Sequence, residues 1–399
     1  MDETAERRKR LTPLKYLPKL FSSFFQGGFE CSTHLLKTGR RLDLIAATAH
    51  DRFALSDYLR LRELGISTVR EGLRWHLVER EPNRYNFDSE LPLVDAGLEA
   101  GVQQIFDLFH FGWPDHLDIF SADFVISFAE LAFEWGRLLR SLGVIEPFVA
   151  PCNEISFFSW AAGDVAYLNP FGRGRGSELK RQMVKAAVAA SQALMDELPG
   201  VTLVWPDPAI HIVGDSNKPG DDEQAERYRL SMFEAWDMVS GRAWPELQGR
   251  PEFLQVVGVN FYDRNEWVNH GRTLKPGDAE YKPFSRILVE VWNRYRVPIF
   301  VSETGTEDEQ RPAWLRMIGE EVRAAIKQGV PVHGICLYPI VNHPGWDDDR
   351  HCFNGLFDYP NAEGRRNIYE PLAAELANQQ HLFDQLEKEQ ELHDQTTTV

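Results

Sequence analysis

The chain has 399 residues, with 60 acidic and 43 basic side chains and a formal net charge of −17. An acidic balance of this size argues against a generally basic surface for nucleic acids or anionic membranes. Hydrophobic residues make up 43% of the chain and 11 residues are tryptophan, so we expect a large core and exclude an intrinsically disordered protein. The length fits two or three ordinary domains, or one large barrel with insertions.

The first ten residues are highly charged and lack the apolar stretch that a secretory signal requires. The sequence contains no run of about 18 apolar residues, so no membrane span is predicted. The four cysteines include no Cys-x-x-Cys pair and fit free thiols in a reducing compartment, with a Cys/His metal site as the alternative. We therefore expect a cytoplasmic protein with neither a membrane nor a nucleic acid as its partner.

From about residue 24 to residue 338, short β-rich apolar runs alternate with longer segments of helical periodicity. This pattern is typical of βα units around a parallel sheet. The candidate strands, in chain order, are residues 24–30, 67–71, 104–110, 148–153, 202–206, 256–262, 299–303 and 334–338. Helix-like stretches between them include residues 57–64, 127–142, 180–198 and 314–328. Eight strands with intervening helices predict an α/β fold, the (β/α)8 barrel.

A doubly wound sheet is the rival architecture, and it normally carries a Gly-x-Gly-x-x-Gly fingerprint after its first strand. Residues 26–30 read Gln-Gly-Gly-Phe-Glu and do not match that fingerprint. The longest gap between strands, residues 206–256, predicts a helical insertion before strand six. We expect a charged N-terminal extension at 1–19, a single barrel domain at 20–378, and an acidic C-terminal tail at 379–399 that begins as a frayed helix.

Polar residues that close the barrel strands are the candidates for function, because the active site of such a barrel lies at the carboxyl ends of its strands. Five strand ends stand out, and they carry Arg70 with Glu71, His110, Asn153 with Glu154, Asn260 with Tyr262, and Glu303. A carboxylate directly after an apolar strand is unusual, because burying an unpaired charge costs several kcal/mol. If Glu154 and Glu303 end the fourth and seventh strands, their carboxylates face each other across the barrel mouth.

Two opposed carboxylates suit glycoside hydrolysis, in which one protonates the leaving oxygen while the other attacks the anomeric carbon or activates water. The same geometry suits a bound metal ion. Glu154 alone is also explained as a helix-start carboxylate that complements the helix dipole. Its occurrence together with Glu303, Arg70, Asn153 and Tyr262 favours a functional site, because several strand ends would otherwise be polar by accident.

Several longer motifs occur in a definite order along the chain. They are GISTVREGLRW at 65–75, QIFDLFHFGWP at 104–114, CNEI at 152–155, WD at 236–237, GRAWP at 241–245, VGVNFY at 257–262 and VSETG at 301–305. Together these motifs resemble the family-1 glycoside hydrolases, the β-glucosidase and β-galactosidase group of retaining (β/α)8 enzymes. CNEI is similar to that family's Thr-Asn-Glu-Pro, and VSETG is similar to its Ile-Thr-Glu-Asn-Gly.

The resemblance implies that Glu154 is the general acid/base and Glu303 the nucleophile. Arg70 would favour the charged form of Glu303, and Tyr262 would orient it by hydrogen bonding. Asn153 would donate to the sugar 2-hydroxyl, an interaction that strengthens in the transition state, and His110 would contact another hydroxyl of the same ring. The matching segments imply further supporting roles for Trp113, Asn260 and Tyr338.

The chain also departs from the family pattern. Phe111 replaces the Trp that usually follows the third-strand His, and Tyr338-Pro339 stands in place of Trp-Ser. The stretch nearest to the first-strand Gln-x-Glu begins at Phe29-Glu30, which makes Glu30 a substrate-binding candidate. The Asn-Phe-Glu-Trp loop is replaced by NHPGWDDDRHCFN at 342–354.

Within that replacement loop, Trp346 and Asp347 are candidates for binding the sugar, because aromatic faces stack on sugars and carboxylates accept hydroxyl bonds. The alternatives for the acidic loop at 346–350 are a solvated loop or a divalent-metal site. Arg173 and Arg175, in the loop after strand four, fit either an exposed flexible loop or an anion-binding element.

The sequence therefore predicts a retaining β-glycoside hydrolase that acts on a neutral sugar glycoside by double displacement, without a cofactor or metal. Its substrate would be a small molecule or an oligosaccharide, and a homo-oligomer is allowed. A transglycosidase on cellular glycans, a non-hydrolytic sugar-binding pseudoenzyme and a metal-dependent barrel hydrolase are the alternatives.

Overall fold

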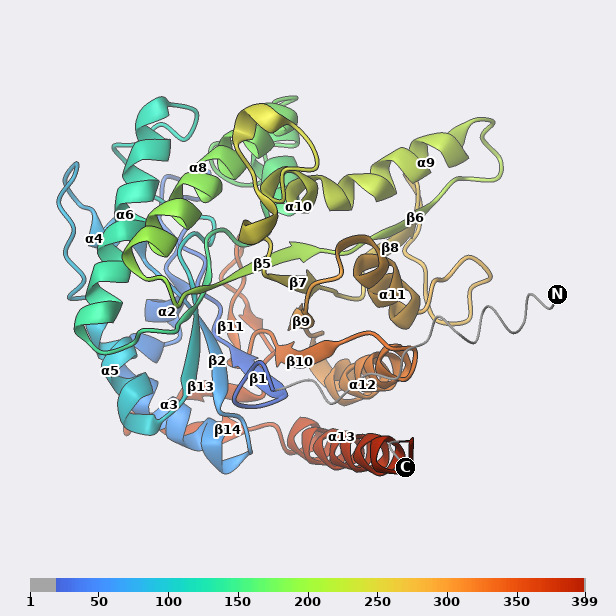
Figure 1. The fold of residues 1–399 in the computed structure, drawn as a ribbon. Helices are drawn as coiled ribbons and strands as arrows, with labels where there is room; N and C mark the ends of the chain where they lie inside the picture. Colours follow the sequence, from blue (N-terminus) through green and yellow to red (C-terminus); the bar gives the residue numbers. More distant parts are fainter. Residues whose placement is uncertain (1–18, 398–399) are drawn as a thin grey trace.

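The computed structural model describes residues 19–397, so most of the N-terminal extension expected at 1–19 lies outside the described residues. Eight parallel strands close into a barrel in which β1 pairs with both β2 and β10 (Figure 1). The barrel strands are β1 (Phe25–Gly28), β2 (Thr68–Gly72), β3 (Gln103–Asp107), β4 (Phe148–Ala150), β5 (Thr202–Pro208), β7 (Val256–Asn260), β9 (Ile299–Thr304) and β10 (Val332–Leu337). The predicted (β/α)8 barrel is confirmed, and each barrel strand overlaps a strand expected from the sequence.

Helices surround this barrel (Figure 1). The main ones are α2 (Leu44–Ala47), α3 (His50–Glu63), α4 (Trp75–Val78), α5 (Leu91–Ala100), α6 (Ala122–Ser141), α7 (Ile155–Phe158), α8 (Gly176–Glu197), α11 (Phe284–Tyr295), α12 (Arg311–Lys327) and α13 (Glu370–Thr397). The start of α6 shows why one of these helices begins where it does. The Ser121 side chain accepts a hydrogen bond from the backbone N–H of Phe124 and caps the helix. One face of α6 then buries Phe124, Phe128 and Trp135.

The segment between β5 and β7 contains α9 (Asp221–Leu230) and α10 (Glu234–Val239), at the place where the sequence predicts a helical insertion. It also contains the short strand β6 (His211–Val213), which pairs in parallel with β8 (Glu266–Val268) after the sixth barrel strand. This pair was not expected, because three-residue strands leave no periodic signal. The tip of α9 and the β6–β8 pair extend to one side of the barrel (Figure 1).

The barrel interior is closed at the amino ends of its strands. Phe21 is buried there and packs on Phe148 and Phe300, with ring centroids 4.9 and 5.0 Å away. The inward-facing residues Ile105 and Val204 belong to the same apolar cluster. The barrel interior is therefore a packed core at this end, and the carboxyl ends of the strands are where this fold places a site.

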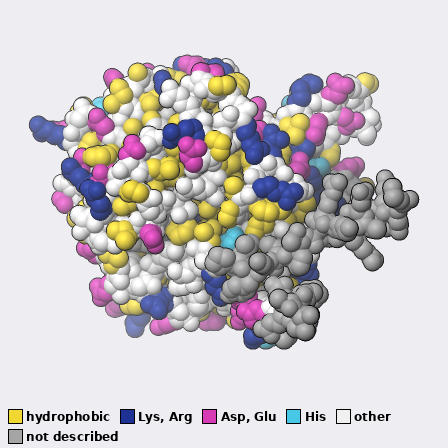
Figure 2. Space-filling model, viewed as in Figure 1, with side chains coloured by type: hydrophobic (Ala, Val, Ile, Leu, Met, Phe, Trp, Pro, Cys, Tyr) yellow, Lys and Arg dark blue, Asp and Glu magenta, His cyan; other side chains and the backbone are white. Residues whose placement is uncertain are grey.

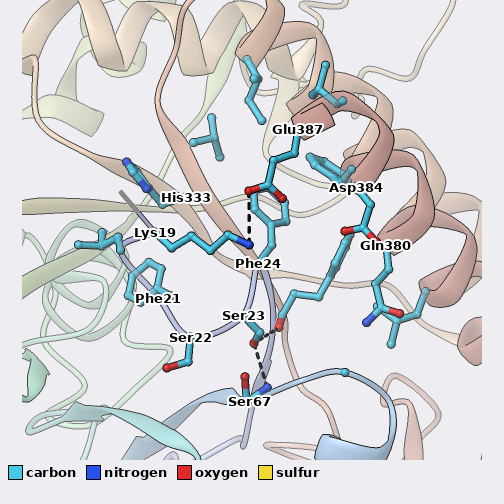
Figure 3. Close-up of a pocket in the computed structure, with 18 of the residues that line it drawn as sticks. Lys19, Phe21, Ser22, Ser23, Phe24, Ser67, His333, Gln380, Asp384 and Glu387 are labelled. Atoms are coloured by element: carbon cyan, nitrogen blue, oxygen red, sulfur yellow. Dashed lines mark hydrogen bonds and ion pairs between the residues drawn. The ribbon is translucent and has the colours of Figure 1, made fainter. Parts of the chain in front are cut away.

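The C-terminal helix α13 continues through residue 379, where the sequence analysis placed the start of the acidic tail. The side chains of Gln379, Phe383 and Leu386 are buried, so this part of the segment is a packed helix and the expected boundary does not fall there. A cavity of about 720 Å³ lies between α13 and the amino ends of β1, β2 and β10. Lys19 reaches across it to Glu387, with 3.3 Å between the charged atoms (Figure 3).

On the face shown in Figure 2, hydrophobic side chains are interspersed with acidic and basic ones. Within residues 19–397, no helix is both long enough and apolar enough to cross a membrane. All four cysteines are free thiols, and all four are buried.

Candidate active site

Glu303 lies in β9 at the carboxyl end of the barrel, and both of its carboxylate oxygens receive a hydrogen bond. Arg70 Nη1 donates to Oε1 at 3.0 Å, and the Tyr262 hydroxyl donates to Oε2 at 2.9 Å. The side chain is buried. Glu303 is thus held in one orientation by a cation from β2 and a phenol that follows β7.

Glu154 follows β4 and immediately precedes α7. Its backbone adopts a left-handed conformation with φ of 49°, which is uncommon for a residue with a side chain and frequent at functional sites. Asn260 Nδ2 donates to Glu154 Oε1 at 2.9 Å, and the Asn260 Oδ1 accepts from the Ser302 hydroxyl at 2.5 Å. Since Asn260 is in register with Glu303 across β7 and β9, one amide side chain links the surroundings of the two carboxyl groups.

Arg70 is the charged centre of the site and is almost fully buried. Besides Glu303, its guanidinium donates to Asp107 Oδ2 at 2.5 Å, to Asn153 Oδ1 at 3.1 Å and to the Ser302 carbonyl at 2.8 Å. Burial opposes the charged form, but the carboxylates of Asp107 and Glu303 raise the pKa of Arg70 well above its ordinary value. The cation is fully paired, which a buried charge requires.

His110 and Asn153 are fixed by the same network. His110 Nδ1 lies 3.0 Å from Asp107 Oδ2, and Asn153 Nδ2 lies 3.2 Å from His110 Nε2. The Tyr338 ring is parallel to the imidazole with centroids 6.0 Å apart, and it also lies 5.2 Å from the Arg70 guanidinium carbon. The structure therefore brings together Arg70, His110, Asn153 and Tyr338, as the sequence predicted from four separate strands.

The two carboxyl groups experience different surroundings. Burial and the charge of Glu303 raise the pKa of Glu154 well above its usual value, and the neutral amide of Asn260 opposes this only in part. Burial also raises the pKa of Glu303, but the charge of Arg70 and the Tyr262 hydroxyl act against it. The surroundings of Glu154 therefore favour the protonated form, whereas Arg70 and Tyr262 favour the ionised form of Glu303. Two carboxyl groups whose environments differ in this way are suited to separate acid and base roles.

The remaining sugar-binding candidates lie on the loops beside this network. Glu30 Oε1 accepts hydrogen bonds from the Ser32 N–H at 3.0 Å and the Ser32 hydroxyl at 2.5 Å, and it lies 3.9 Å from His110 Nε2. Trp346 packs edge-on against Phe111, the residue after His110, with centroids 5.8 Å apart. Asp347 is exposed.

Trp113 and Arg175, two residues singled out in the sequence, are each engaged by neighbouring residues in the structure. Trp113 is buried among aromatic rings that include Phe109 and Phe158, and its indole N–H donates to the Leu117 carbonyl at 3.0 Å. The structure therefore does not bring Trp113 to the carboxyl groups. The other candidate, Arg175, binds both carboxylate oxygens of Glu178 at 2.7 Å and lies 3.6 Å from the Phe120 ring centroid, so its guanidinium is already paired.

A possible metal site overlaps the same network. Among the described residues, the ligand atoms of Cys31, Asp107 and His110 lie within 4.8 Å of one another. Asp107 already binds the Arg70 guanidinium through both oxygens, at 3.3 and 2.5 Å. A divalent ion would have to compete with that buried cation, so these residues fit a metal poorly.

The sequence reasoning missed two buried carboxylates at the site, Asp107 and Asp207. Asp107 lies inside the expected third strand, and its role depends on a contact with Arg70 on another strand. Asp207 comes at the carboxyl end of β5, one residue beyond the stretch expected as a strand, and the criterion applied to the other strand ends would have found it.

No family model matches the sequence. Over 162 residues the chain is 26% identical to a β-galactosidase from Sulfolobus acidocaldarius, a match that spans 32% of this chain and about a third of that protein's length. The structure is similar to a family 1 β-glucosidase from Thermotoga maritima, with a TM-score of 0.73, 15% identity and coverage of 92% of this chain and 99% of that one. The chain has the fold of the family 1 β-glucosidases. An enzyme from Alicyclobacillus herbarius called AHE matches equally well, with a TM-score of 0.73, 17% identity and coverage of 92% and 100%.

Proposed function

We propose that this protein is a retaining β-glycoside hydrolase that acts on a neutral sugar glycoside by double displacement. The observation that carries the proposal is the contrast between Glu154, a buried carboxyl group with a raised pKa, and Glu303, which is paired with Arg70 and Tyr262. A proton donor opposite an ionised carboxylate is the pair that this mechanism requires. The likeness to a β-glucosidase and a β-galactosidase adds support.

In the first step, the Glu303 carboxylate attacks the anomeric carbon while the glycosidic C–O bond breaks. Glu154 gives its proton to the departing oxygen, and a glycosyl ester of Glu303 forms. In the second step, Glu154, now ionised, takes a proton from water as the water oxygen attacks the anomeric carbon. The ester bond breaks, the sugar leaves with its original configuration, and Glu303 returns to the carboxylate form.

The polar groups around Glu303 suit a neutral sugar. Arg70, the cation that contacts the proposed nucleophile, already donates to Asp107, Asn153 and Glu303 and has no free fork for an anionic substituent. Asn153, His110 and Glu30 offer donors and acceptors for ring hydroxyls, with Trp346 at their edge as an apolar surface. We assign these residues to sugar recognition.

The deciding experiment is active-site labelling with 2-deoxy-2-fluoro glycosides, chosen from those sugars whose nitrophenyl glycosides the protein hydrolyses. Mass spectrometry of the digested protein should find the sugar on Glu303, and NMR of the early product should show retained configuration. A label on another residue of an active enzyme, or an inverted product, would overturn the proposed mechanism. Added acceptor sugars separate hydrolysis from transglycosylation, because a transglycosidase would form mainly disaccharide.

A further inference from the structure

Asp207 is a buried carboxylate at the carboxyl end of β5, and both of its oxygens contact Ser156. The Ser156 backbone N–H donates to Oδ1 at 3.0 Å, and the Ser156 hydroxyl donates to Oδ2 at 2.7 Å. Ser156 is the second residue of α7, whose first N–H groups have no partner within the helix. The residue at the cap position is Glu154, and its side chain makes no capping bond. Asp207 therefore supplies the cap of α7 from a different strand.

The same strand end also holds the backbone of Glu154. Its N–H donates to the Pro206 carbonyl at 2.9 Å, so neighbouring residues of β5 bind residues 154 and 156. The Glu154 carboxyl group is held from the next strand by Asn260, which is in register with Pro208. The left-handed backbone of Glu154 persists only while its surroundings fix it. The bond from Glu154 to Pro206 and the bonds from Ser156 to Asp207 both contribute to this.

We propose that Asp207 is a positioning residue for Glu154 and that it holds the proposed acid/base carboxyl group in place through Ser156. The inference rests on the proposed function, because it assigns to Asp207 a role in the proton transfer of Glu154. Asp207 acts through Ser156 and the first turn of α7, and touches no reacting atom.

Burial is the main cause of the raised pKa of Glu154, and the charges around the pair add to it. The carboxylates of Glu303 and Asp207 raise the pKa of Glu154, whereas Asn260 and the charge of His110 lower it. Tyr262, which follows β7, faces both carboxyl groups of the proposed catalytic pair. Removing the charge of Asp207 should therefore lower the pKa of Glu154 and leave less of it protonated at neutral and alkaline pH.

Burial raises the pKa of Asp207 to about 7, against the hydrogen bonds from Ser156 and the charge of Lys180 on α8. Cys152, two residues beyond β4, is a neutral thiol, because burial and the charges of Asp207 and Asp107 raise the pKa of Cys152 well above its ordinary value.

Two substitutions separate the charge from the geometry. Asp207→Asn keeps an acceptor for the Ser156 N–H but loses the charge, so the alkaline limb of the kcat/KM profile should move down by about 0.5 pH unit. Asp207→Ala also frees the first turn of α7. It should lower kcat/KM about 10-fold or more for an alkyl glycoside, which needs protonation, and less than about 2-fold for a dinitrophenyl glycoside.

The matched control is a second buried carboxylate that accepts a hydrogen bond from a serine hydroxyl. The Ser127 hydroxyl donates to Glu79 Oε2 at 2.6 Å, between α6 and the residue that ends α4. Glu79→Gln should lower the melting temperature and leave both the pH profile and the ratio of the two substrates unchanged. If Asp207→Ala lowers kcat/KM equally for both substrates, as a loss of stability alone does, the positioning role is wrong.

An infrared titration keeps this test separate from the proposed function. The difference spectrum between the wild-type protein and Glu154→Gln reports the protonation of Glu154 without any turnover. In the Asp207→Asn background that titration should shift to lower pH. Failure of the wild-type protein to cleave any glycoside would contradict the proposed function. An unshifted Glu154 titration, with or without activity, would contradict the role of Asp207.

Discussion

Arg70 and Glu303 form a buried ion pair between two strands that are not neighbours in the barrel, with 3.0 Å between Nη1 and Oε1. The same guanidinium binds Asp107, which in turn contacts His110. One cation therefore sets the charge of the proposed nucleophile and the position of a proposed sugar-binding residue. Substituting Arg70 should therefore affect both catalysis and stability.

Replacing Arg70 by Met should damage stability and activity together. Glu303 and Asp107 would lose their common cation, and breaking a buried pair in this way costs about 3–5 kcal/mol. Arg70 lowers the pKa of Glu303, so its removal raises that pKa and moves the acidic limb of the activity profile to higher pH. Urea denaturation and a pH–rate profile measure the two effects. An unchanged acidic limb in a folded variant would contradict the assigned role.

Removing each of the two proposed catalytic carboxyl groups should give opposite behaviour with an added anion. Glu303→Gly removes the proposed nucleophile, so activity should fall by about 10³-fold or more. Added azide should restore turnover and give an α-glycosyl azide as the product. Glu154→Gly should keep the first step with activated leaving groups, and azide should give the β-glycosyl azide. Chromatography and NMR of the products distinguish the two. The exposed residue Glu309, replaced by Gln, should behave as the wild type.

The buried cluster of His50, Asp57 and Glu71 should make stability depend on alkaline pH. The ring nitrogens of His50 lie 2.7 and 3.0 Å from the two carboxylates. Burial opposes its charge, but both acids raise the pKa of His50 to about 9. This folded value exceeds the unfolded value, so the stabilisation is complete below about pH 6.5 and is lost as the pH rises through 9.

The pKa difference of His50 corresponds to roughly 3 kcal/mol of unfolding free energy. Chemical denaturation at pH 6, 8 and 10 should show this loss in the wild type, and His50→Gln should flatten the dependence. The exposed residue His381 serves as the control, since its replacement by Gln should leave the curve unchanged. Equal slopes in the wild type and His50→Gln would assign the pH dependence to other groups.

Two tryptophans near the barrel mouth should respond differently to substitution. Trp113 is buried among aromatic rings, so Trp113→Ala should cost about 3–5 kcal/mol of stability. Trp346 is half-buried at the edge of the sugar-binding residues, so Trp346→Ala should raise KM about 10-fold with a small change in melting temperature. Thermal denaturation and steady-state kinetics test both variants. A large loss of stability in Trp346→Ala, or a raised KM without one in Trp113→Ala, would contradict these assignments.

Most of the barrel was predictable because its strands are compact apolar runs that end in polar residues. The polar ends at residues 70, 110, 154, 260 and 303 meet in the structure because parallel strands place their carboxyl ends at one rim. Asp107 was not predictable in this way, because its meaning depends on the distant Arg70. The packing of α13 beyond residue 379 was not predicted, because the polar composition of that segment outweighed the three-residue spacing of Phe383 and Leu386.

Phe21 fills the barrel interior at the end opposite Glu303, where it packs on Phe148 and Phe300. This apolar plug leaves no path through the barrel axis from the amino ends of the strands. Under the proposed double displacement, the departing aglycone and the incoming water would therefore exchange on the side of the carboxyl ends of the strands.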